Sequence, residues 1–138
     1  MDADPTAGFR ERPHTADWAL EVWAPDLLAL LKHAAIGMYT LMGVRPSSPQ
    51  RVTHQFALPF DDAESLLVSF LSELLYLSGH ANIAFDTFDL TMTASTLQAT
   101  VSGSPITTPA KEIKAVTYHN LKVRRTQRGL ATTIVFDV

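Results

Sequence analysis

The chain contains no cysteine among its 138 residues. Disulfide bridges, thiolate metal sites and cysteine nucleophiles are therefore all excluded. This absence fits a protein of the reducing cytosol, and we expect a cytoplasmic location. Residues 1–5 are acidic and contain no apolar core, so they are not expected to act as a signal peptide.

A strong net charge is also lacking. The 11 Lys and Arg residues and the 14 Asp and Glu residues give a formal net charge of −3. Nucleic-acid binding depends mainly on clustered Lys and Arg, so a mildly acidic chain is a poor candidate for binding RNA on its own. Any contact with RNA is therefore expected to be indirect.

Long apolar runs and nucleotide motifs are missing as well. The longest apolar stretch, residues 24–44, is interrupted by Asp26, Lys32 and His33, which makes it too polar and too periodic for a membrane span. Neither G-x-x-x-x-G-K-[ST] nor G-x-G-x-x-G occurs, and no serine lies on a nucleophile elbow. We therefore predict no membrane partner, no nucleotide site of these kinds and no hydrolytic triad.

What is present is typical of one packed domain. The hydrophobic fraction of 46% and the charged fraction of 18% are ordinary for a globular protein, and the length is that of a single domain. Residues 1–8 are small or polar and are expected to be a disordered lead. Residues 9–138 are expected to form the domain.

Two helices are predicted from apolar stripes at three- and four-residue spacing. The first begins after Asp26 as its N-cap and ends at Gly43. The second is expected to begin at Asp61 and Asp62 and to stop at Gly79; if Asp61 is the N-cap, Glu64 falls at N3 and completes a capping box.

Roughly seven strands are predicted from alternating apolar and polar residues. They cover residues 18–23, 51–58, 88–92, 97–101, 113–119, 121–123 and 130–138; a short strand-like segment precedes them at 9–12, and a basic turn lies at 124–129. Because the helices come early and the hairpins late, we predict an α+β fold. It is a two-layer sandwich in which both helices pack on one face of a largely antiparallel sheet.

The stretch His14-Thr15-Ala16-Asp17 directly precedes a strand, and Asp137 nearly ends the last one. If those strands are neighbours, the two carboxylates lie close together and favour a cation between them. A hard cation such as Ca²⁺ or Mg²⁺ needs several oxygens, and Val138 adds a terminal carboxylate. The alternative is that both aspartates are solvated residues at strand ends.

A second polar group consists of Lys114, Tyr118 and His119. Lys114 and Tyr118 share a face of a straight strand, and the lysine would be a charge partner for the two aspartates. The alternative is that Lys114 lies on an edge strand and prevents that edge from pairing with another chain. The three arginines at 124, 125 and 128 are expected to be a solvated hairpin tip, with an acidic partner or RNA as the other interpretations.

Four segments together resemble one family. His14-Thr15-Ala16-Asp17, Leu71-Ser72-Glu73-Leu74-Leu75-Tyr76, Lys114-Ala115-Val116-Thr117-Tyr118-His119 and Phe136-Asp137-Val138 match, in order, the signatures of the archease family. The resemblance runs from about Phe9 to Val138. It implies the same α+β fold.

The resemblance also implies a function. Such a protein is not itself an enzyme but activates the GTP- and metal-dependent RNA ligase that joins 3′-phosphate ends to 5′-hydroxyl ends in tRNA splicing or RNA repair. It does so by promoting guanylylation of the ligase. Carried over by position, Asp17, Asp137 and Val138 would bind a divalent cation. Ca²⁺ is the first choice, with Mg²⁺ or Mn²⁺ as alternatives. Lys114 would lie at the same site.

The remaining members of the two polar groups, His14, Tyr118 and His119, are expected to surround this site. Two other functions stay open at this point. One is a stand-alone metal-dependent phosphoesterase, which would need its own turnover. The other is a general chaperone-like interaction module, which would need no metal site.

Overall fold

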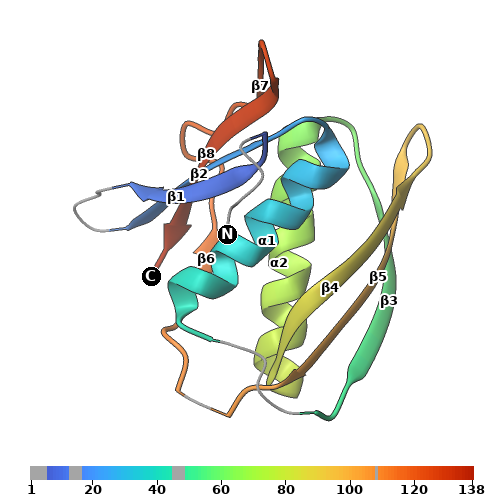
Figure 1. The fold of residues 1–138 in the computed structure, drawn as a ribbon, viewed down its shortest axis with the longest axis vertical. Coiled ribbons are helices and arrows are strands. Elements are labelled where there is room, and N and C mark those ends of the chain that lie inside the picture. Colours follow the sequence, from blue (N-terminus) through green and yellow to red (C-terminus); the bar gives the residue numbers. More distant parts are fainter. Residues whose placement is uncertain (1–5, 13–16, 45–48, 108) are drawn as a thin grey trace.

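The computed structural model describes residues 6–12, 17–44, 49–107 and 109–138. Two helices and eight strands follow one another along these residues, as Figure 1 shows. Their bounds are β1 Gly8–Arg12, β2 Trp18–Ala24, α1 Leu27–Met42, β3 Val52–Pro59, α2 Ala63–Ala81, β4 Ile83–Met92, β5 Thr96–Pro105, β6 Ala115–Val116, β7 Arg124–Thr126 and β8 Gly129–Asp137.

The α+β class with two helices is confirmed, but the strands form two antiparallel sheets where one was expected. The larger sheet has the order β1-β2-β8-β6, and β7 also pairs with β8. The smaller has the order β3-β5-β4. The helices lie between the sheets in Figure 1, and each contacts strands of both. Neither described helix is long and apolar enough to cross a membrane.

The first helix has the predicted ends. The Asp26 side chain accepts a hydrogen bond of 2.9 Å from the backbone N–H of Ala29, which satisfies one of the unpaired donors of the first turn. Gly43 follows the helix at φ 76°, a left-handed conformation that glycine adopts without steric cost.

The second helix begins at the predicted pair of aspartates, but the predicted C-terminal end was wrong. Asp62, not Asp61, is the N-cap, and it forms the capping box with Ser65. Hydrogen bonds from Ser65 to the Asp62 carboxylate, first of all from its backbone N–H, hold the pKa of the Asp62 carboxyl below its usual value. Gly79 lies inside the helix, which continues to Ala81 and ends at Asn82 in the left-handed conformation.

Two predicted strands also need correction. Of the expected strand 113–119 only Ala115 and Val116 pair, and Asn120 turns the chain at φ 52°. Residues 121–123 form no strand; the pairing begins at Arg124, which had been assigned to the turn. At the chain start, β1 begins at Gly8 and Ala7 is buried, so the expected disordered lead includes packed residues.

The core is formed where the helices meet the sheets. Ile134 and Phe136 of β8 and Leu20 of β2 have no exposed surface. They pack in one cluster with fully buried residues of the helices, including Leu30, Leu31, Leu66, Leu67, Phe70 and Leu71. Because side chains alternate along a strand, burial of Phe136 directs Asp137 to the other face. The core thus fixes the orientation of the chain end.

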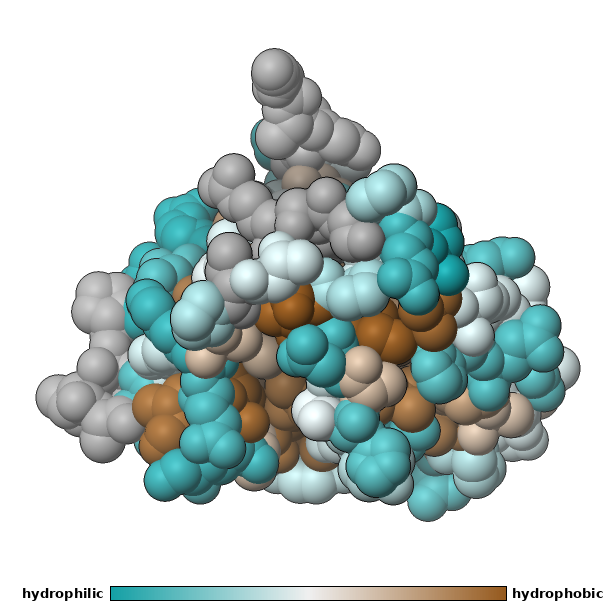
Figure 2. All heavy atoms as spheres, turned by 90° about the horizontal axis from the view of Figure 1, so that it is seen from below, coloured by the Kyte–Doolittle hydropathy of each residue, from teal (hydrophilic) through white to brown (hydrophobic). Residues whose placement is uncertain are grey.

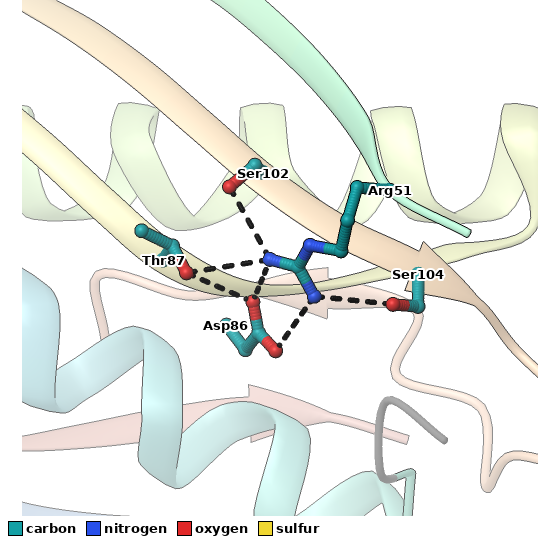
Figure 3. Close-up of polar contacts among 5 residues, drawn as sticks. All are labelled: Arg51, Asp86, Thr87, Ser102 and Ser104. Atoms are coloured by element: carbon teal, nitrogen blue, oxygen red, sulfur yellow. Dashed lines mark hydrogen bonds and ion pairs between the residues drawn. The ribbon is translucent and has the colours of Figure 1, made fainter. Parts of the chain in front are cut away.

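A polar cluster holds the smaller sheet together at one end (Figure 3). The Arg51 guanidinium contacts both carboxylate oxygens of Asp86, at 2.5 and 3.1 Å, and the hydroxyls of Thr87, Ser102 and Ser104. The Arg51 side chain also keeps the pKa of the Asp86 carboxyl below its usual value. The pairing of β4 with β5 shifts between Phe85 and Thr87. Arg51 therefore ties the three strands together at an irregular point.

Figure 2 looks onto the end of the molecule that is lowest in Figure 1 and shows apolar surface between polar residues. Near the C-terminal ends of α1 and α2, Met42, Leu75, Ile106 and Ile113 help to line a cavity of about 380 Å³. The backbone N–H of Lys111 donates to the carbonyl oxygen of Met42 at 2.9 Å. This contact fastens residues 109–114 at the C-terminal end of α1.

Candidate functional site

The strand β8 lies between the two segments that carry the predicted site residues. On one side it pairs with β2, and Trp18 is opposite Phe136. In an antiparallel ladder, the residue before Trp18 and the residue after Phe136 are the next pair. Asp17 directly precedes β2 and Asp137 ends β8, so both aspartates lie at the same end of this pair of strands.

On its other side β8 pairs with β6, where Ala115 is opposite Asp137. The backbone N–H of Lys114 donates to the carbonyl oxygen of Asp137 at 2.7 Å. Further along, the backbone N–H and the hydroxyl of Thr117 both donate to the carbonyl oxygen of Val135, at 3.0 and 2.9 Å. The lysine segment is thus held beside the chain end by main-chain bonds.

The exposure of these residues suits a site at the protein surface. Asp137 and Lys114 are exposed, while Asp17 is half-buried. Val138 is also half-buried, and its side chain packs against the core. Packing of that side chain restricts where the terminal carboxylate can lie. The carboxylates are therefore carried on fixed segments and still open to a partner or an ion.

The chemistry of this donor set fits a hard cation. Two aspartates and a main-chain carboxylate offer only oxygen ligands, which Ca²⁺, Mg²⁺ and Mn²⁺ prefer over softer metals. Within the described residues, no group of three or more His, Cys, Asp or Glu side chains is placed to hold a metal. The metal ligands Asp17, Asp137 and Val138 therefore stay a prediction.

The other predicted site residues are arranged differently from the expectation. Because the segment 113–119 is not a straight strand, Lys114 and Tyr118 do not share a strand face as predicted. Tyr118 is 59% exposed, and the His119 backbone N–H donates to the hydroxyl of Thr117 at 3.2 Å. His14 lies outside the described residues.

One feature was not foreseen from the sequence. Ser72, Leu75 and Tyr76 of α2 line a hollow of about 310 Å³ together with residues 113–116, which include Lys114. Tyr76 is 62% exposed, and it and Tyr118 are the large hydrophobic side chains exposed on the described part of the chain. The two sequence signatures that contain these tyrosines lie far apart in the chain. Only the fold shows that residues of both line one hollow beside Asp137.

Comparison with known proteins gives a consistent picture. A model of the Archease protein family matches residues 9–138. Protein archease of Methanosarcina acetivorans is 31% identical over 91% of this chain and 92% of its own length. Probable protein archease of Mycobacterium tuberculosis is 26% identical over 96% of this chain and 76% of its own length.

Two solved structures have the same fold. The crystal structure of an archease from Thermotoga maritima, described as a possible chaperone, has a TM-score of 0.69 at 25% identity and covers 92% of this chain and 96% of its own. The solution structure of Methanobacterium thermoautotrophicum protein 1598 also has a TM-score of 0.69, at 21% identity, with 95% and 99% covered. The resemblance seen in the four sequence signatures is thereby confirmed, and the chain belongs to the archease family.

Proposed function

We propose that this protein is a non-catalytic activator of a GTP- and metal-dependent RNA ligase. That ligase joins 3′-phosphate or cyclic-phosphate ends to 5′-hydroxyl ends in cytoplasmic tRNA splicing or RNA repair. One observation supports the proposal: Asp17 precedes β2 and Asp137 ends β8 at the same end of this pair of strands, and the backbone N–H of Lys114 donates to the carbonyl oxygen of Asp137. Membership of the archease family supports it.

The carboxylates would act on the ligase histidine that accepts the nucleotide. A carboxylate that accepts a hydrogen bond from one ring nitrogen fixes the tautomer and orientation of an imidazole, so the other nitrogen is directed at its target. Asp137, on a strand paired on both sides, is rigid enough for this task. Here the target would be the α-phosphate of GTP, and the result would be faster guanylylation.

Asp17, Asp137 and the Val138 carboxylate would hold the divalent cation. When bound, the cation supplies positive charge that offsets neighbouring carboxylates and polarises phosphate oxygens. The ammonium group of Lys114 would compensate part of the same negative charge. Because Lys114 and Asp137 are exposed, they can enter the active site of a second protein.

The hollow between α2 and residues 113–116 would provide the contact with the ligase. Tyrosine is enriched at protein interfaces because its ring buries a large apolar area while its hydroxyl keeps a polar contact. Tyr76 is exposed and lines the hollow with Lys114, and Tyr118 is exposed in the segment that follows Lys114. Docking there would direct the chain end into the ligase.

The test is a guanylylation assay with GTP, a partner ligase and this protein. Asp17→Asn and Asp137→Asn are expected to lose most of the stimulation, because each removes a carboxylate charge while keeping the side-chain shape. Asp89→Asn is the matched control, since Asp89 is exposed and belongs to β4 of the other sheet. Equal stimulation by all three variants would contradict the site.

A chaperone is the second candidate, because the Thermotoga maritima relative is described as a possible chaperone. It predicts that Tyr76→Ser and Tyr118→Ser reduce protection of a client from aggregation, while Asp17→Asn and Asp137→Asn have no effect. Measuring both activities on the same four variants separates the two functions.

A further inference from the structure

The charges of this chain are strongly segregated along the sequence. Residues 113–136 contain five basic residues and no Asp or Glu, whereas the rest of the chain holds six basic and all 14 acidic residues. The segment therefore carries a formal charge of +5 and the remainder −8, which together give the net −3. The small net charge of the whole chain conceals a basic region. Net charge is therefore a poor guide to what a local surface binds.

The fold gathers four of these five cations at one point. Arg124 and Arg125 belong to β7, Arg128 forms the turn into β8, and Lys122 lies just before β7. All four are exposed. The β7–β8 hairpin projects from the body of the protein at the top of Figure 1. We call residues 122–128 the basic hairpin.

The basic hairpin is held firmly at its base. Gly129 packs so tightly that an added Cβ would lie 2.3 Å from the carbonyl oxygen of Ala24. The Thr132 hydroxyl donates to the Lys122 carbonyl oxygen at 2.8 Å, and the Val123 N–H donates to the Glu64 carboxylate at 2.8 Å. These contacts fix the backbone in position while the long basic side chains extend into solvent.

The four cations also lack acidic partners. Among the described residues, no acidic side chain forms an ion pair with a cation of the basic hairpin. In contrast, the Arg51 guanidinium is occupied by Asp86. A guanidinium that is not occupied in this way can form two parallel hydrogen bonds with a phosphate.

The composition of the basic hairpin favours nucleic acid over protein as the partner. Protein interfaces need an apolar core, from which charged residues are depleted. Here residues 124–128 contain no apolar side chain, and Val123 and Leu130, which line the neighbouring hollow with Arg125, are half-buried. No aromatic residue occurs between 119 and 135, so stacking on bases is not provided. Cations without an apolar core suit the phosphate backbone, which is recognised by charge and spacing.

We infer that the basic hairpin binds the phosphate backbone of RNA directly, without base specificity. This goes beyond ligase activation and does not rest on it, because the isolated protein suffices to test it. It also replaces the expectation from net charge that RNA contact is indirect. The nine residues of β8 separate the hairpin from Asp137 by about 25 Å, so RNA and a second protein could be bound together.

The experiment measures binding of a fluorescent single-stranded RNA and of an RNA stem-loop by anisotropy, over a range of salt concentrations. The test variant is Arg124→Gln/Arg125→Gln/Arg128→Gln. The matched control is Arg10→Gln/Arg12→Gln/Lys32→Gln, which removes the same charge from exposed residues elsewhere. Poly-glutamate is the competitor that represents an acidic protein.

We expect the parent to bind both RNAs, with the affinity for the single strand falling about 50-fold between 50 and 200 mM salt if all four cations contact phosphates. The test variant should bind at least about tenfold more weakly and show a salt slope smaller by about 2. The control should change little. The test variant should still stimulate ligase guanylylation in the absence of RNA, since the Asp137 end is unchanged.

Three results would overturn the inference. The first is that the parent does not bind RNA at low salt. The second is that the test variant and the control lose RNA affinity equally. The third is that poly-glutamate displaces the RNA at equal charge concentration. Loss of guanylylation without RNA in the test variant would instead assign the hairpin to the ligase. Failure of Asp137→Asn to reduce guanylylation would contradict the proposed function and leave RNA binding untouched.

Discussion

The substitution Gly129→Ala should strongly destabilise the protein. Gly129 has φ 135°, a conformation that side chains other than glycine rarely adopt. Holding alanine there costs about 1–3 kcal/mol. Its Cβ would lie 2.3 Å from the Ala24 carbonyl oxygen and 2.6 Å from the Cα of Pro25. Both are backbone atoms that cannot rotate away, so relief requires β8 to move from β2.

That movement would break the pairing of Leu130 with Ala24 at the end of the β2–β8 ladder. Loss of a backbone hydrogen bond adds about 1 kcal/mol. The free energy of unfolding should therefore fall by about 2–4 kcal/mol in total. With a urea m-value of about 2 kcal/mol/M, the midpoint should fall by about 1–2 M.

The matched control is the same substitution at Gly79. This residue is exposed inside α2, and an added Cβ meets nothing within 4 Å. Alanine is favoured over glycine in a helix, so Gly79→Ala should stabilise the protein by about 0.5–1 kcal/mol. Urea unfolding followed by far-ultraviolet circular dichroism measures both variants. A parental midpoint for Gly129→Ala, or a lower one for Gly79→Ala, would refute the reasoning.

Three further outcomes are expected. Burial raises the pKa of Tyr39 to about 12, which favours the neutral phenol in the folded state. The contribution of this group to the free energy of unfolding should be fully present below pH about 10 and should fall by about 2–3 kcal/mol towards pH 12. Alkaline unfolding of Tyr39→Phe should lack this component, and an unchanged pH profile would contradict it. Glu64→Ala leaves the Val123 N–H without its acceptor and should cost about 1–2 kcal/mol by urea unfolding, whereas Glu73→Ala, also on α2, should cost less. A tag fused after Val138 should weaken divalent-cation binding measured by calorimetry, while an N-terminal tag should not; equal affinities would remove the terminal carboxylate from the ligand set.

Local features of the sequence predicted what depends on near neighbours. Asp26 and Gly43 bound the first helix as expected, because a cap is formed by residues three or four positions apart. At the second helix, the choice of N-cap between Asp61 and Asp62 was ambiguous. Glu64 lies three residues after Asp61 and Ser65 three residues after Asp62, so either pair could form a capping box. Tertiary contact decided it: Glu64 accepts from the distant Val123 N–H, and Asp62 caps with Ser65.

Strand extents were harder to predict, because pairing depends on residues far away in the chain. The run 113–119 has the composition of a strand, yet only Ala115 and Val116 pair. The segment can pair only where it lies along β8, and the chain turns away at Asn120. For the same reason, alternation along single strands could not reveal that they divide into two sheets.

By itself, the sequence determined the class of the fold, the absence of thiol chemistry, the family signatures and the residues that could form a carboxylate site. Only the tertiary structure shows that β2 and β8 pair, so that Asp17 and Asp137 lie at the same end of two adjacent strands, and that the Lys114 N–H donates to the Asp137 carbonyl oxygen. It also turned a nearly neutral total charge into a basic hairpin at one end of β8 and carboxylates at the other. The physical reason is that pairing register and side-chain exposure are set by contacts between segments more than 100 residues apart, such as β2 and β8.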